Sequence, residues 1–535
     1  MTPATDAAGG DGPLQRRRSW AATGLIALLV LLTRVPYFFE YVIDVDESTY
    51  LLMGRSLLEG HLPYIQLWDA KPPLAFMLVA AFMAGPGNDV VQLRLWGSIM
   101  VFVSAMLVRS IARRSVDPRL ATPAALLFVI GCAVTKSGQA TMMEYVALPF
   151  LLGALRILVD APVSAQRAFV AGGLVAAAAL VRLNLGFVAP ALGLMLLSRA
   201  WKTGPLREIG VAASFAAGGC IVLGFVAFPY WVGGDLELFV GSCLGASVSH
   251  SATQTSWATA LALAIERTLG LRYSPGLGNR AFILALLVWL PAMAGGAYVA
   301  WGYRSLGHPR RHAVQVLGAA LAAVALSIPL AGIFYEHHTL QLLPFAAILA
   351  AIAYQWLGRR GTARRVTVLV AASMVAALAL KPVPQQWKRV LDRAQAGELM
   401  AGPVKDLADY LHPRCGPDCS VFLLIDHLGY WLLDKPLPTK IAHPSNLAVP
   451  YVYTLPGMRS RSPEEEFTAI LAGKPAYVVI RSAESPRPRV DDGYDLAIGH
   501  LQHHYRKVHE YGSGTGLRDV YQLRPGPEER GDGGR

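Results

Sequence analysis

The sequence predicts a mainly α-helical protein: a polytopic transmembrane helix bundle followed by a C-terminal α/β domain. Of its 535 residues, 54% are hydrophobic and only 16% are charged, whereas a soluble protein carries about a quarter charged residues. The mean hydropathy is +0.40. This composition excludes a large soluble enzyme, a disordered chain and a coiled coil. The net charge of +12 arises from short basic clusters between apolar runs. That pattern indicates orientation in a bilayer rather than binding to nucleic acid.

Eleven apolar runs predict about eleven membrane spans within residues 20–381. The first, from Trp20 to about Val35, follows a polar tail of residues 1–19 that ends in three arginines. No small-residue cleavage site follows, so an uncleaved first span with a cytoplasmic N-terminus is expected. The later runs lie at 92–112, 120–135, 145–159, 168–181, 185–199, 209–231, 280–302, 313–333, 339–357 and 366–381.

The basic residues between these runs support the order of the spans. With this assignment, all the clusters fall on the side of the N-terminal arginines, as the positive-inside rule requires. The clusters are Arg113, Arg114 and Arg119; Arg167; Arg199, Lys202 and Arg207; Arg304, Arg310 and Arg311; and Arg359, Arg360, Arg364 and Arg365. An odd number of spans predicts a multi-pass protein of the plasma (inner) membrane with its C-terminal part outside, on the periplasmic face.

Residues 382–524 alternate between strand-like and helix-like segments, which predicts an extracytoplasmic α/β domain. The strand-like runs are 421–425, 476–480 and 520–523, and the helix-like stretches are about 402–411, 463–472 and 494–504. The Gly-Ser-Gly-Thr-Gly segment at 512–516 has no helix after it and predicts a hairpin loop. Residues 525–535 predict a disordered tail. Cys415 and Cys419 allow a disulfide if this domain faces an oxidising compartment, or a zinc site whose other ligands are not evident.

The loop 37–91, predicted to lie outside, carries three acids within four residues, Asp44, Asp46 and Glu47. Acids beside a bilayer are costly unless they are solvated, paired or used. Asp44 can cap a helix, and Glu47 can complete a capping-box pattern. Asp46 is not explained in this way. The helix dipole would favour its ionised form, which makes it a candidate general base or a ligand for a cation.

Lys71-Pro72-Pro73 also admits two interpretations. The prolines stiffen the entry into a helix, and Lys71 is either a lysine that snorkels to the membrane interface or a cation for a phosphate near the membrane surface. Residues 74–85 are apolar but short, and they fit a helix that lies along the interface.

Taken together, these motifs resemble the GT-C membrane glycosyltransferases. The pattern is Asp46-Glu47, Tyr50, Gly60-x-x-Pro63-Tyr64, and Trp68-Asp69-x-Lys71-Pro72-Pro73, with Arg94 opening the next span. More narrowly, it is similar to the bacterial branch related to protein O-mannosyltransferases and to the 4-amino-arabinose lipid A transferases. The span count, the outer first loop and the outer C-terminal domain extend the likeness over most of the chain.

The resemblance implies transfer of a sugar from a polyprenyl-phosphate carrier to a cell-envelope acceptor, whether lipid, glycan or protein, at the outer membrane face. It implies Asp46 as the catalytic acid, Glu47 as its support and Lys71 at the donor phosphate. Glu144 would be the second acid that the family often has. Arg182 and Asn184 could hold phosphate or sugar, or could be paired interfacial polar groups.

The segment Phe334-Tyr335-Glu336-His337-His338 falls where the family often has an aromatic or basic residue near the carrier phosphate. Adjacent residues on an α-helix point about 100° apart, so His337 and His338 are not expected to form a two-histidine metal face. No cofactor is firmly implied, and a divalent cation remains a candidate. The alternative functions are a polytopic transporter or lipid flippase, and a polymerase or ligase of surface glycans. A transporter would carry ionisable residues near mid-span or an internal repeat, whereas the charges here gather at span ends and in outer loops.

Overall fold

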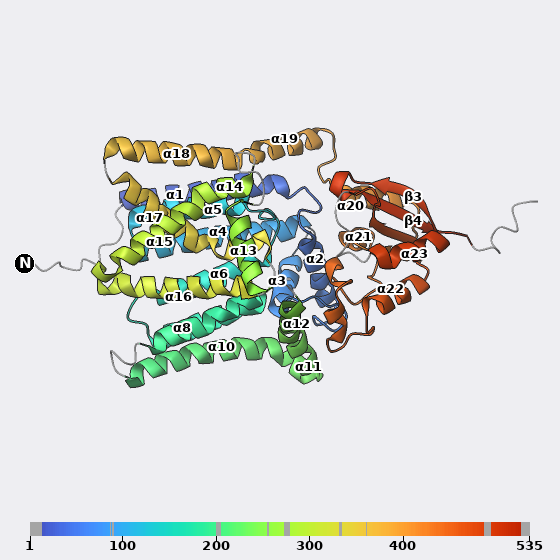
Figure 1. Ribbon diagram of the computed structural model, residues 1–535, viewed down its shortest axis with the longest axis horizontal. Helices are drawn as coiled ribbons and strands as arrows, with labels where there is room; N and C mark the ends of the chain where they lie inside the picture. The colour runs from blue at the N-terminus through green and yellow to red at the C-terminus, as the bar shows by residue number, and fades with distance from the viewer. Residues whose placement is uncertain are drawn as a thin grey trace, which may run out of the picture.

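The computed structural model describes residues 13–85, 87, 90–198, 205–253, 256–271, 279–330, 334–359, 361–485 and 494–525. Every predicted apolar run overlaps a helix of the bundle (Figure 1), and residues 199 and 331–333 at the ends of two runs lie outside the described residues. These helices are α1 (Pro13–Arg34), α4 (Val90–Ser115), α5 (Ala121–Val134), α6 (Met143–Leu158), α7 (Ala165–Val181), α8 (Val188–Leu197), α10 (Pro205–Gly233), α14 (Arg280–Leu284) with α15 (Leu290–Gly302), α16 (His308–Leu330), α17 (Leu343–Gly358) and α18 (Thr362–Leu380).

Among the described residues, six helices are long and apolar enough to cross a membrane, and the other runs form shorter helices. The six contain the first, second, seventh, eighth, ninth and eleventh predicted runs. The chain is therefore a multi-pass membrane protein. The number of spans and the direction in which they cross stay predictions.

The first helix begins at Pro13, earlier than the predicted start of the span at residue 20. Arginine is a good helix former, so the basic segment Arg16–Arg18 continues the helix instead of ending it. Residues 1–12 of the predicted cytoplasmic tail lie outside the described residues.

Glycines allow α7 and α10 to pack backbone against backbone. A Cβ atom at Gly172 would lie 1.8 Å from the carbonyl oxygen of Phe215, and one at Gly218 would lie 2.0 Å from that of Phe169. Small residues at helix contacts are typical of packing in membranes, where close backbone approach replaces the hydrophobic effect between helices. The outer faces of α10 and α18 expose large apolar side chains such as Phe225.

Several helices lie at the end of the bundle that faces the C-terminal domain (Figure 1). The loop after α1 contains α2 (Val45–Leu58) and α3 (Pro73–Met83), and the segment after α10 contains α11 (Leu236–Val240), α12 (Ala246–Thr253) and α13 (Trp257–Thr268). Gly54 allows α2 to approach α3, because a Cβ there would lie 2.9 Å from Cγ1 of Val79. The helix predicted at 74–85 is α3. Its place along the membrane interface remains a prediction.

The C-terminal domain contains a four-stranded mixed sheet in the order β1-β2-β4-β3. Its strands are β1 (Val421–Leu423), β2 (Tyr477–Arg481), β3 (Tyr505–Tyr511) and β4 (Arg518–Leu523). β1 pairs parallel with β2, and β4 pairs antiparallel with both β2 and β3. Its helices are α20 (Pro403–Leu411), α21 (Leu428–Leu432), α22 (Pro463–Ala472) and α23 (Tyr494–His504).

The three strands and three helices predicted in this domain are all present, within a few residues. The hairpin loop predicted at 512–516 joins β3 to β4. β3 is absent from the predicted strands because Val508 is the one apolar side chain among its five middle residues, so the segment lacks an apolar alternation. The disulfide alternative holds for Cys415 and Cys419, which are bonded.

One further helix, α19 (Pro382–Gln395), follows α18 at the predicted domain boundary. The boundary at residue 382 itself stays a prediction. Of the predicted disordered tail, residues 526–535 lie outside the described residues.

Candidate active site

Asp46 lies in the first turn of α2, where two neighbours fix its position. Asp44 caps the helix as predicted, and its Oδ1 accepts a hydrogen bond of 3.1 Å from the Asp46 backbone N–H. One turn later, the buried Tyr50 donates its hydroxyl hydrogen to Oδ2 of Asp46 at 2.9 Å. The Asp46 side chain is 14% exposed. Residues four apart share a helix face, so this contact follows from the local sequence.

Glu47 forms a buried ion pair with Arg94 of α4. The Arg94 guanidinium donates to Oε1 at 3.0 Å and to Oε2 at 2.7 Å. The backbone N–H of Thr141 donates to Oε1 at 2.8 Å, and Arg94 also donates to the Tyr37 carbonyl at 2.7 Å. The side chain of Glu47 therefore does not close a capping box. It ties the first turn of α2 to α4 and to the loop before α6.

Lys71 places a cation beside the Asp46 carboxylate. Its Nζ lies 3.4 Å from Oδ1 of Asp46 and 3.2 Å from Oδ2 of Asp69, and 5.2 Å from the ring centre of Tyr50. Burial alone would lower the pKa of Lys71, but the two carboxylates outweigh it and raise that pKa above its usual value. Burial alone would raise the pKa of Asp46, but Lys71 and a hydrogen bond from His443 hold it well below the usual range. Both groups are therefore charged.

His443 of the C-terminal domain is the site residue that the sequence did not predict. Its Nε2 lies 3.0 Å from Oδ1 of Asp46. Nearly 400 residues separate the two in the chain, and His443 falls in a turn of the polar tail with no motif around it. No local signal could have identified it, because only the docking of the domain onto the first loop brings the two side chains together.

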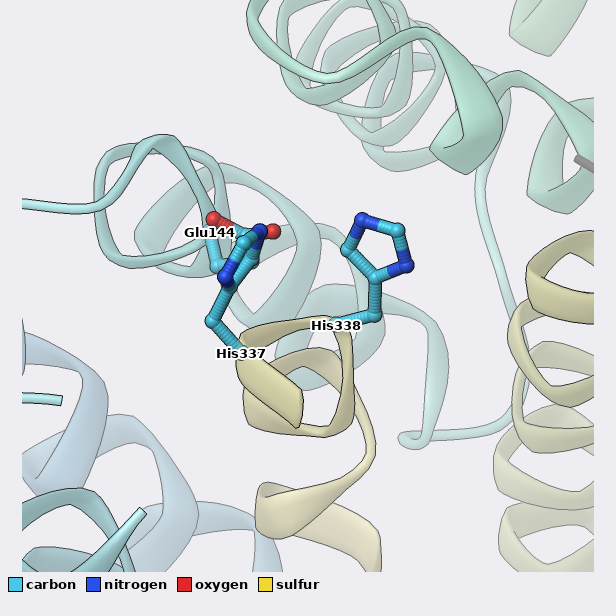
Figure 2. Close-up of side chains that lie close together, drawn as sticks. All are labelled: Glu144, His337 and His338. Atoms are coloured by element: carbon cyan, nitrogen blue, oxygen red, sulfur yellow. The ribbon is translucent and has the colours of Figure 1, made fainter. Parts of the chain in front are cut away.

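The structure brings Glu144, Arg182, His337 and His338 together in a second cluster. Glu144, in the first turn of α6, is buried and forms an ion pair with Arg182 at 2.6 Å. His337 and His338 lie in the short helix η7 (Glu336–Gln341). The ligand atoms of Glu144 and both histidines all lie within 4.8 Å of one another, and Figure 2 shows the carboxylate and the two imidazole rings gathered in one place.

These three side chains could hold a divalent cation. Two imidazoles and one carboxylate suit Zn²⁺ and several other transition metals. The expectation that adjacent histidines cannot share a metal assumed a regular α-helix. Here they lie in a 3₁₀ turn, the planes of their two rings meet at 85°, and the third ligand comes from another helix. Arg182 competes with a cation for Glu144, because it already neutralises that carboxylate.

Asn184 is a paired polar group, the second of the two roles expected for it. Its amide donates to Ser327 at 2.9 Å and to Gln341 at 2.8 Å. These contacts join the segment after α7 to α16 and to η7. Asn184 therefore holds the helices that carry Arg182 and the histidines in place.

The Asp46 cluster and the Glu144 cluster are close enough to interact electrostatically. Asp46 interacts with His337, and Lys71 interacts with Arg182. A cavity of about 240 Å³ beside η7 is lined by apolar and neutral polar side chains, by the cations Lys136, Arg267 and Arg280, and by the carboxylate of Glu336. A larger cavity, of about 600 Å³, lies between the second half of α2 and the C-terminal domain, and neither cluster lines it.

These features define a class of protein: a multi-pass membrane protein with an ionised carboxylate, several cations and a titratable cluster where the bundle meets its C-terminal domain. No protein-family model matches the sequence, and no curated protein matches it.

The fold of the chain is similar to those of several solved membrane enzymes. The chain is similar to ArnT from Cupriavidus metallidurans bound to undecaprenyl phosphate, with 14% identity, 94% of this chain and 98% of that chain covered, and a TM-score of 0.61. ArnT in the apo state gives 15% identity, the same coverage and a TM-score of 0.60. The oligosaccharyltransferase of Archaeoglobus fulgidus in the apo form gives 14% identity, 96% and 75% coverage, and a TM-score of 0.54. The oligosaccharyltransferase AglB from Archaeoglobus fulgidus, in complex with an inhibitory peptide and a dolichol-phosphate, gives 13% identity, 97% and 75% coverage, and a TM-score of 0.53.

ArnT and AglB are both GT-C membrane glycosyltransferases. The chain has the fold of these enzymes, and the resemblance predicted from the loop motifs is confirmed for the fold. At these identities the likeness shows the fold alone.

Proposed function

We propose that this protein is a glycosyltransferase that moves a sugar from a polyprenyl-phosphate-linked donor to a cell-envelope acceptor. The observation that carries this proposal is the ionised Asp46 with Lys71 at 3.4 Å and Tyr50 at 2.9 Å. A carboxylate and a cation side by side are what a base and a departing phosphate require. Similar folds are known with undecaprenyl phosphate in ArnT and with dolichol-phosphate in AglB.

In the proposed reaction, Asp46 takes the proton from an acceptor hydroxyl as that oxygen attacks the anomeric carbon. The bond from the anomeric carbon to the phosphate oxygen breaks, and the lipid phosphate leaves with the electron pair. Because the phosphate is already a leaving group, no nucleotide is needed. Direct attack by the acceptor inverts the anomeric centre, whereas retention would need a covalent step.

Lys71 controls when Asp46 can act as a base. Without donor, Lys71 pairs with both Asp46 and Asp69 and keeps the pKa of Asp46 low, which makes Asp46 a weak base. A donor phosphate that attracts Lys71 would remove that cation and bring a negative charge closer. Both changes raise the pKa of Asp46, so the base becomes stronger when the donor is bound.

Arg182, His337 and His338 lie where they can offset the charge that develops on the departing phosphate. Glu144 orients Arg182 through their ion pair. If a divalent cation takes part, Glu144, His337 and His338 would hold it, and it would supply further positive charge near the phosphate. Glu47 supports the site indirectly, by fixing the turn that carries Asp46.

The proposed setting is the outer face of the inner membrane, with the N-terminus in the cytoplasm and the C-terminal domain outside. There the lipid tail of the carrier stays in hydrocarbon, while its phosphate and sugar reach polar groups at the interface. The positive-inside pattern of the loops supports this orientation.

The experiment that tests the proposal is a profile of lipids and envelope glycans in cells lacking the gene. We expect one glycan modification to disappear and an unused polyprenyl-phosphate sugar to accumulate. Wild-type protein restores the modification, and so does the control Asp409→Asn, which changes an exposed aspartate of α20. Unchanged profiles in the deletion cells would contradict the proposal, and a change in lipid distribution between leaflets without a missing glycan would favour a flippase.

A further inference from the structure

One loop of the C-terminal domain reaches across to the first loop of the bundle and docks beside Asp46. The backbone N–H of Trp68 donates to the Lys440 carbonyl at 2.7 Å, and the N–H of Ala442 donates to the Trp68 carbonyl at 2.9 Å. Trp68 is fully buried. At the far end of this docking loop, residues 439–446, the Asn446 amide donates to Oδ1 of Asp69 at 3.1 Å.

A buried histidine within the domain holds the docking loop from behind. Nδ1 of His427 lies 2.7 Å from the carbonyl of Ala442, the residue before His443. A carbonyl oxygen only accepts, so Nδ1 is the donor. Burial lowers the pKa of His427 to about 4, so this imidazole is neutral and the contact does not depend on an added charge. The backbone on both sides of His443 is therefore fixed.

The hydrogen bonds around His443 determine which nitrogen carries its proton. The backbone N–H of Ser445 donates to Nδ1 at 3.3 Å, and the Ser445 hydroxyl lies 2.7 Å from the same atom. A backbone N–H can only donate, so Nδ1 offers its lone pair. In the neutral ring the proton then lies on Nε2, 3.0 Å from Oδ1 of Asp46. His443 therefore donates a hydrogen bond to the carboxylate and does not compete for the acceptor's proton.

Three of the roughly four lone-pair positions on the Asp46 carboxylate have a partner. Tyr50 occupies Oδ2 at 2.9 Å, while His443 and Lys71 share Oδ1 at 3.0 and 3.4 Å. If Lys71 moves to a donor phosphate, Tyr50 and His443 still hold one oxygen each. The lone pair that Lys71 releases on Oδ1 is then free to accept the acceptor's hydroxyl proton.

We propose that His443 is a positioning residue for the transfer reaction: its Nε2–H fixes the rotation of the Asp46 carboxylate, so that the oxygen released by Lys71 faces the acceptor. The C-terminal domain then completes the active site instead of only covering it. This inference rests on the proposed glycosyl transfer, with Asp46 as the base.

Glutamine and asparagine at position 443 separate this role from a purely structural one. The amide nitrogen of glutamine can take the place of Nε2, whereas the shorter asparagine can only take the place of Nδ1. Full-length His443→Gln, His443→Asn and His443→Leu proteins would be assayed in membranes, with the polyprenyl-phosphate sugar fraction that accumulates in deletion cells as the donor. His503→Leu, an exposed histidine of α23 in the same domain, is the matched control.

We expect the Asn and Leu variants to lose roughly 10- to 100-fold in kcat with little change in the donor KM, because a base misplaced by about 1 Å costs up to 10²-fold. The Gln variant should recover to within about threefold of wild type. Equal losses in the Gln and Asn variants, or wild-type rates in all three, would overturn the role of His443.

Asp46→Asn in the same assay tells the two proposals apart. An inactive Asp46→Asn protein beside fully active His443 variants would remove only the role of His443. A fully active Asp46→Asn protein would remove the proposed base, and the role of His443 with it. Because the Gln and Asn variants differ by one methylene group, their comparison stands even if the Leu variant fails to fold.

Discussion

The buried pair of Glu47 and Arg94 predicts a large loss of stability that is separate from catalysis. Glu47→Gln leaves Arg94 as an unpaired cation in a site where the Arg94 side chain is 0% and the Glu47 side chain 2% exposed. Removing one partner of a buried ion pair typically costs about 3–5 kcal/mol. Arg94→Met should cost a similar amount, because it leaves the Glu47 carboxylate with only the Thr141 N–H at 2.8 Å.

The double variant Glu47→Gln/Arg94→Met removes both charges, so it should cost clearly less than the sum of the single variants, by about 0.5–3 kcal/mol of coupling. The assay is thermal unfolding of the purified proteins in one detergent, followed by intrinsic fluorescence. Transfer activity per folded molecule is measured in parallel at low temperature. If Glu47→Gln unfolds like wild type but has lost transfer activity, Glu47 takes part in the chemistry and its structural assignment is wrong.

Three further predictions concern the pH dependence of transfer, the metal site and the orientation in the membrane. The acid limb of the pH profile should lie at a higher pH for kcat than for kcat/KM. The parameter kcat/KM reports the free enzyme, in which Lys71 holds the pKa of Asp46 low, whereas kcat reports the donor complex, in which Lys71 has turned to the phosphate. Acid limbs at the same pH would contradict this. Zn²⁺ added to chelator-treated protein should raise its unfolding temperature, an effect that His337→Ala abolishes and the control His503→Ala keeps; an equal shift in His337→Ala would exclude this site as the one that binds the metal. A tag fused after Arg535 should be accessible to a protease from outside in spheroplasts; protection until the membrane is permeabilised would reverse the proposed orientation.

The helices and the local part of the site could be predicted from the sequence because both depend on neighbours in the chain. Apolar runs predict the bundle helices, and the acids at 44–47 predict the helix start that Asp44 caps. β3 could not be predicted, because its middle residues are mostly polar and do not alternate with apolar ones.

What the sequence could not supply are contacts set by tertiary packing. The partner of Glu47 is Arg94 rather than its own helix N-terminus. Adjacent histidines on a regular α-helix would not face one metal. The 3₁₀ turn η7 and the packing of Glu144 against it bring the three side chains together. His443 reaches Asp46 only through docking of a domain that begins hundreds of residues later.

The transfer rate of a purified, correctly folded Asp46→Asn protein tests most directly whether Asp46 is the base. Asparagine keeps the size of the side chain and can still accept from Tyr50, but it cannot take a proton from a hydroxyl. A general base contributes about 10²–10⁴-fold, so we predict that the rate per folded molecule falls at least a hundredfold, whereas Asp409→Asn keeps the wild-type rate. Transfer at a rate near that of wild type would contradict the assignment of Asp46 as the base.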